Sequence, residues 1–146
     1  MPETVSDAQQ YEQLLQQARE QIQSPSEDGL SQALSWLDDA ARLSDGKNEE
    51  IVGIRKKVQK ELKTLHARQL YKETKTACEM LWGQEQDLLK AKVNPNRILE
   101  DVFSAALKRA EDAYNQYPSF LLLEGLKNDA QIQFNRARDR YQIKNT

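Results

Sequence analysis

Side chains that could support chemistry are few and scattered. His66 is the only histidine and Cys78 the only cysteine among the 146 residues. A catalytic histidine needs a positioned nucleophile or a second acid–base group. No Ser/His/Asp motif, glycine-rich elbow or neighbouring cysteine accompanies His66. We therefore interpret His66 as a surface or boundary residue.

Cys78 follows Ala77 in a predicted apolar helical stripe, which favours a small buried side chain over a reactive thiol. A single cysteine can form neither an internal disulfide nor a thiolate metal site, and this favours a reducing compartment. Acidic residues occur as adjacent pairs, such as Asp38-Asp39. Neighbours diverge by about 100° around a helix, so such pairs do not converge on a metal. No Glu-x-x-His motif of a di-iron site occurs. We predict no catalytic residue, no cofactor and no metal site, and expect a protein that is not an enzyme.

The strongest candidate for a binding surface is a basic segment in the middle of the chain. Residues 51–75 hold eight basic and two acidic side chains, a balance of +6, whereas residues 1–50 hold three basic and eleven acidic ones, a balance of −8. Lysines in this segment are spaced by four and three residues and share one helical face. Trp36 falls one residue away from an apolar seam, where it could flank a groove or contact a third helix. The candidate partner-binding residues are Arg55, Lys56, Lys60, Lys63, Arg68 and Trp36.

Three interpretations of the basic segment stay open. It is a solvated helix face, or it pairs with the acidic first 50 residues within the fold or between copies, or it binds an acidic partner. Such a partner would be a peptide, a nucleic acid or a membrane surface. Nucleic acid is the weakest of these, because the pI is ≈ 5.5 and no known nucleic-acid-binding module is recognisable. We expect a protein or peptide partner, and an acidic partner is one of the three interpretations above. A homodimer is the alternative.

The elements that carry these residues are predicted to be helices. The chain has only 5 glycines and 4 prolines, and its few valines form no alternating run. The fold class is therefore predicted to be all-α. The N-terminal residues lack the pattern of a signal peptide, and no apolar run approaches the length of a membrane span. We expect a cytoplasmic protein without a membrane-spanning segment.

Helix boundaries follow from local capping patterns. Ser6 with Gln9 predicts a capping box at the start of the first helix. The sequence Ser-Pro-Ser-Glu at 24–27 predicts a second helix with Ser24 as the N-cap, which ends near Ser44 before Asp45-Gly46. The third helix is predicted to begin near Asn48.

The third helix is predicted to continue through residues 65–75, because that stretch contains no glycine, proline or asparagine. Gly83 is a weaker candidate for a break. Asn94 and Pro95 predict another helix start, with Asn94 as the N-cap. Pro118 is predicted to end that helix before a final one.

An internal repeat organises these helices. Residues 13–59 align with residues 87–131 at an offset of about 70 to 74 residues. We predict two tandem three-helix units of about 73 residues, built from antiparallel helix hairpins that share a long central helix. Their predicted bounds are 1–66 and 67–146. Gly53 and Gly125 occupy matching helical positions, and we expect close helix packing there, so that Gly53→Ala would destabilise the fold.

Small and apolar residues recur in both units at fixed offsets before a turn. They are Ala33, Leu37 and Ala40 before Asp45, then Ile51 and Ile54; and Ala106, Ala110 and Ala113 before Pro118, then Leu123 and Leu126. This pattern resembles the tetratricopeptide repeat, which implies right-handed stacking of helix hairpins and a concave, peptide- or protein-binding face. The chain departs from that family in its period, about 73 instead of 34 residues, and in having Asp45 and Arg55 where proline and glycine are usual.

A helix shared between successive three-helix units is similar to a spectrin-type rod. These patterns lead us to expect a non-catalytic helical-repeat interaction or scaffold module that belongs to a larger protein or assembly. The alternative is a self-associating structural spacer rod of the spectrin-like type.

Overall fold

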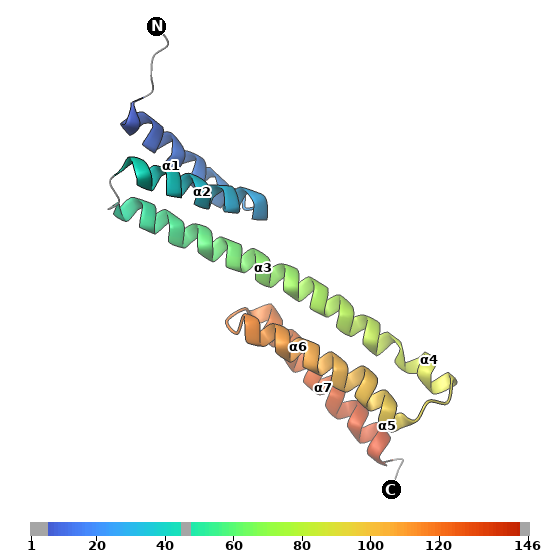
Figure 1. The fold of residues 1–146 in the computed structure, drawn as a ribbon. Coiled ribbons are helices and arrows are strands. Elements are labelled where there is room, and N and C mark those ends of the chain that lie inside the picture. Colours follow the sequence, from blue (N-terminus) through green and yellow to red (C-terminus); the bar gives the residue numbers. More distant parts are fainter. Residues whose placement is uncertain (1–5, 45–47, 144–146) are drawn as a thin grey trace. The chain divides into compact units, whose positions relative to one another are not determined.

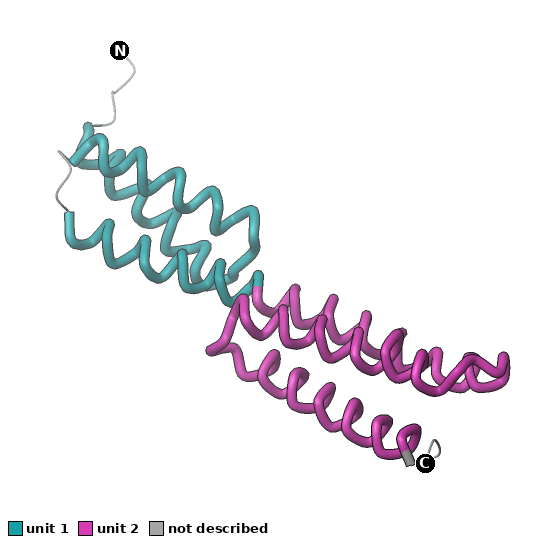
Figure 2. Tube along the Cα trace, turned by 60° about the horizontal axis from the view of Figure 1, so that its bottom comes forward, with its two compact units in different colours: residues 1–66 teal, residues 67–146 magenta. Residues whose placement is uncertain are grey.

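The computed structural model describes residues 6–44 and 48–143, and these form helices without any strand (Figure 1). The predicted all-α class is confirmed. The chain divides into two compact units, residues 1–66 and 67–146 (Figure 2). Helix α3, Glu49–Gly83, is continuous across that boundary, as the uninterrupted helical pattern predicted.

The first unit contains α1 (Asp7–Gln23), α2 (Glu27–Leu43) and the first part of α3. The predicted capping box of α1 is confirmed, since the Ser6 hydroxyl accepts a hydrogen bond from the Gln9 backbone N–H and the Gln9 side chain accepts one from the Ser6 N–H. The three helices enclose one apolar core. Its buried members are Leu15, Ala18, Leu30, Ala33, Leu37, Ala40, Ile51, Ile54 and Val58.

The predicted N-cap of α2 is wrong by two residues. Ser26, not Ser24, is the N-cap, and its Oγ accepts a hydrogen bond from the Gly29 N–H at 3.0 Å. Both serines fit the local pattern, but capping from Ser26 places Glu27 and Asp28 in the first turn, where carboxylates favour the positive end of the helix dipole. Helix α2 ends at Leu43, and the predicted stop at Asp45-Gly46 lies outside the described residues.

The second unit begins inside α3, whose end at Gly83 confirms the weaker predicted break. Asn94 caps the next helix through its Oδ1, which accepts a hydrogen bond from the Asn96 N–H at 2.8 Å, and Pro95 is the first helical residue, as predicted. The remaining elements are α4 (Glu85–Lys90), α5 (Pro95–Ile98), the π-helical segment η1 (Leu99–Ser104), α6 (Ala105–Gln116) and α7 (Leu121–Ile143).

Segment η1 was not predicted, because apolar spacing does not distinguish an α-turn from the wider π-turn. Its side chains Val102 and Phe103 are buried. They belong to a cluster with Ile98, Ala137 and Tyr141, while a separate cluster contains Cys78, Ala106, Ala110, Leu126 and Ala130. Leu81 and Trp82 pack against both clusters and so link them.

The two glycines matched by the repeat do not mediate close packing, so that expectation is wrong. A Cβ atom built on either Gly53 or Gly125 would meet no heavy atom within 4 Å. Both residues are exposed. At 100° per residue, Gly53 points about 130° away from the centre of the Ile51–Ile54–Val58 stripe, and so faces outward.

Candidate interaction surface on helix α3

Three lysines form an exposed stripe on α3. Lys56, Lys60 and Lys63 lie within an arc of about 60° around the helix, on the side opposite the buried Ile51–Ile54–Val58 stripe. Packing of the apolar stripe into the core sets the rotation of the helix about its axis. The same packing therefore turns the lysines towards solvent. We call these three residues the lysine stripe.

No ion pair joins the lysine stripe to any residue that the structure describes. Neighbouring cations do find partners: Arg55 lies 2.6 Å from Asp38, and Arg19 pairs with Glu50. Pairing with the acidic first 50 residues thus accounts for Arg55 and leaves the three lysine charges uncompensated within the described part of the chain. Like charges so close together raise the local positive potential, which attracts an acidic ligand.

The other candidate residues lie elsewhere. Arg68 is exposed on α3 but belongs to the second unit, and it is rotated by about 120° from Lys56. Trp36 is on α2 and packs, partly buried, against the core of the first unit. Arg55 is held by Asp38. The lysine stripe is the part of the predicted set that forms one face.

The matching face of α7 is uncharged. The positions that correspond to the lysine stripe are Asn128, Ile132 and Asn135, by the register that pairs buried Ile54 with buried Leu126. Ile132 is exposed. A helix in this setting therefore tolerates neutral side chains on its outer face, and the fold does not require lysines there.

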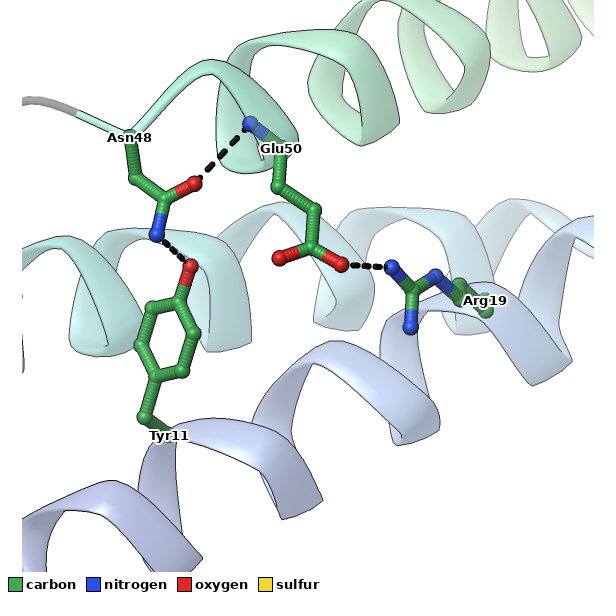
Figure 3. Close-up of polar contacts among 4 residues, drawn as sticks. All are labelled: Tyr11, Arg19, Asn48 and Glu50. Atoms are coloured by element: carbon green, nitrogen blue, oxygen red, sulfur yellow. Dashed lines mark hydrogen bonds and ion pairs between the residues drawn. The ribbon is translucent and has the colours of Figure 1, made fainter.

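A polar network holds the start of α3 against α1 (Figure 3). Asn48 donates from its Nδ2 to the Tyr11 hydroxyl, and its Oδ1 accepts a hydrogen bond from the Glu50 N–H at 2.9 Å. Glu50 in turn pairs with Arg19. Burial, followed by the nearby charges of Glu50 and Glu12, raises the pKa of Tyr11. The network positions the first turn of α3, two turns before the lysine stripe begins.

Sequence reasoning did not find this network. Tyr11 and Asn48 are 37 residues apart, and Arg19 and Glu50 are 31 apart, so no local spacing connects them. The Ser6 and Asn94 caps, by contrast, act within two or three residues. The only available signal was the predicted helix start near Asn48.

A shallow hollow of ≈ 240 Å³ lies between α1 and α3 in the first unit. Ile22 and Ile54 supply apolar lining, and Lys57 supplies positive charge beside Arg19, whose charge is paired with Glu50. An apolar side chain flanked by a carboxylate would match both features.

The two candidate reactive side chains, His66 and Cys78, make contacts that hold the fold together. His66 is partly exposed, with its Nε2 3.3 Å from the Glu27 carboxylate, as expected for a surface or boundary histidine. Cys78 is fully buried, which confirms the predicted packing role, and its Sγ donates to the Ala106 carbonyl at 3.4 Å. Burial raises the pKa of the Cys78 thiol.

Within residues 6–44 and 48–143, no cluster of three or more His, Cys, Asp or Glu side chains could hold a metal ion. None of the helices in these ranges combines the length and apolar character needed to cross a membrane. Comparison of the chain with family models, curated proteins and solved structures finds no match.

Proposed function

We propose that this chain is a non-catalytic helical-repeat module that binds an acidic segment of a partner protein through the lysine stripe. The observation that carries the proposal is the set of three exposed lysines on one face of α3, to which the described residues contribute no ion pair. The neutral face at the matching positions of α7 supports it, because the lysines are not explained by a common structural need.

The hollow beside α3 supports the same conclusion. Its lining by Ile22 and Ile54 offers burial to an apolar side chain, and Lys57 extends the positive charge towards the stripe. A segment that combines acidic residues with one apolar anchor would use both features. Buried anchors contribute most of the affinity at protein interfaces, whereas rim charges contribute association rate and specificity.

Burial at the repeated positions supports a tetratricopeptide-like arrangement of two tandem three-helix units. All ten small or apolar residues that carry the resemblance are buried, from Ala33 to Ile54 in one unit and from Ala106 to Leu126 in the other. Such units present surface more readily than they enclose an active site. The proposed setting is a scaffold in a reducing, cytoplasmic environment.

A structural spacer of the spectrin-like type is the second candidate. The continuity of α3 through the boundary between His66 and Ala67 favours it, because a spectrin-type rod shares a helix between successive units.

The test of the interaction module is a quantitative pull-down from nuclease-treated lysate of the source cells. The bait variants are wild type, a triple change of the lysine stripe to glutamate, and a matched control with Asn128, Ile132 and Asn135 changed to glutamate. We expect one or more proteins to be captured by the wild type and the control and lost from the stripe variant. Equal capture by all three baits would contradict the lysine stripe as the binding face.

A further inference from the structure

Each unit has a hollow at a position that the two aligned segments share. In the first unit, the hollow between α1 and α3 is lined by Ile54, which directly follows Gly53. In the second unit, a groove of ≈ 320 Å³ between α3 and α7 is lined by Leu126, which directly follows Gly125. The register that pairs Ile54 with Leu126 also pairs the two glycines. The hollows therefore lie at matching positions of the aligned segments, and we call the second one the α7 groove.

The two hollows differ in charge at one matching position. Lys57 lines the hollow of the first unit, and by the same register its counterpart in the α7 groove is Asp129. Asp129 is exposed, and none of the ion pairs among the described residues includes it. The other charged residues of the groove, Lys75 and Glu79, lie 4.0 Å apart, so their opposite charges offset each other. The α7 groove is therefore acidic where the hollow of the first unit is basic.

Apolar side chains form much of the remaining lining of the α7 groove. Leu121 and Leu122 on α7 are 77% and 50% exposed. Tyr71 and Trp82 supply aromatic lining from α3. Large apolar side chains that gather at one exposed site are typical of binding surfaces, whereas single exposed ones are common everywhere. An apolar side chain of a partner would cover this surface.

Gly125 keeps the α7 groove open. It lines the groove, and beyond the backbone of its own helix a Cβ built on it would meet no heavy atom within 4 Å. Glycine inside a helix costs about 1 kcal/mol relative to alanine. Packing among the described residues does not account for this cost. Access to the groove does account for it, because a larger side chain at this position would stand in the groove.

We propose that the α7 groove is a docking site for a segment of a partner protein that carries an apolar side chain beside a lysine or arginine. The apolar side chain covers Leu122 and Trp82, and the cation pairs with Asp129. The opposite charge at the matching position, Lys57, makes the two hollows selective for different segments. This site lies within the second unit and does not depend on the proposed function, which rests on the lysine stripe of the first unit.

The readout is the fluorescence of Trp82 in a Trp36→Phe background, because Trp82 lines the groove and the chain has only these two tryptophans. The probes are two short synthetic peptides of alanine and glutamine, with leucines one helical turn apart that are flanked by lysines in one peptide and by glutamates in the other. We expect the lysine peptide to shift the Trp82 emission with a Kd below about 1 mM. It should bind about tenfold or more tightly than the glutamate peptide.

Charge and shape variants locate the site. Asp129→Lys should reverse the preference between the peptides, since it gives the groove the charge of the first hollow. Asp112→Lys makes the same charge change at an exposed position of α6 outside the groove, and it should leave the preference unchanged. Gly125→Gln should weaken binding of the lysine peptide by about tenfold or more, whereas Gly53→Gln in the first unit should not. Both glycine replacements introduce a better helix former, so loss of folding does not confound the result.

Three outcomes would overturn the inference. The first is no response of Trp82 to the lysine peptide up to about 1 mM. The second is a preference that Asp112→Lys reverses as fully as Asp129→Lys does. The third is undiminished binding of the lysine peptide by Gly125→Gln. None of these outcomes bears on the lysine stripe, which is tested by its own variants in the first unit.

Discussion

Replacing Gly53 by alanine should stabilise the first unit, even though its position inside a helix and its match to Gly125 suggested close packing. Beyond the local backbone of α3 itself, no heavy atom of the described residues lies within 4 Å of the added methyl group, so the change introduces no clash with another helix. What remains is the intrinsic preference of helix interiors for alanine over glycine, about 1 kcal/mol. For a chain of 146 residues that unfolds in one coupled transition this corresponds to a rise in Tm of about 2–4 °C.

The assay is thermal and urea unfolding followed by tryptophan fluorescence. Trp36 lies in the first unit and Trp82 in the second, so a Trp82→Phe background reports on the first unit alone. The urea midpoint should rise without a change in the m-value, because the surface exposed on unfolding stays the same.

Gly29→Ala is the informative contrast. A Cβ at Gly29 would clash with the Gln21 Oε1 and lie 2.7 Å from the Ser26 Oγ, which is the N-cap oxygen of α2. The flexible glutamine can move, but displacing Ser26 weakens the cap, at a cost of about 0.5–2 kcal/mol. We expect no stabilisation at Gly29. A lower Tm for Gly53→Ala would refute the argument and show that packing at this position is tight.

Further predictions concern the polar network, a buried phenol and the shared helix. Asn48→Ala should destabilise the first unit by about 1–2 kcal/mol, because it removes a hydrogen bond to the first turn of α3 and the partner of Tyr11; an unchanged urea midpoint would contradict this role. The pKa of Tyr141 is raised above 10.0 by burial and then by Glu85, so its contribution to stability is complete at lower pH and is lost as the pH rises through the folded-state pKa. Unfolding measured between pH 8 and 11 should show this loss in the wild type and less of it in Tyr141→Phe. Gln69→Pro, at a cost of about 3 kcal/mol, should separate the unfolding transitions reported by Trp36 and Trp82. Gln69→Ala, the control, should leave the transitions as in the wild type. One unchanged transition in the proline variant would show that α3 does not couple the units.

Several features could be predicted from the sequence because they depend on contacts between residues close together in the chain. The capping box of Ser6 and the Asn94-Pro95 helix start depend on hydrogen bonds between residues two or three apart, and both occur as predicted. The continuity of α3 follows from an unbroken run of helix-forming residues. The stripe of Lys56, Lys60 and Lys63 follows from helical spacing alone. Where two nearby residues fit the same pattern, as for the N-cap of α2, local rules do not choose between them.

Other features required the packed helices. Pairing of Arg55 with Asp38 and of Arg19 with Glu50 joins residues 17 and 31 positions apart. This pairing distinguishes compensated cations from the lysine stripe, which has no ion-pair partner within residues 6–44 and 48–143. The packing around Gly53 could likewise not be predicted from the sequence. Sequence spacing indicates that a residue lies in a helix, but not whether a neighbouring helix lies against it. Residues two to four apart meet wherever a helix forms, so their contacts can be inferred from sequence. Residues on different helices meet only once packing sets the rotation and register of each helix, and that outcome depends on the whole core.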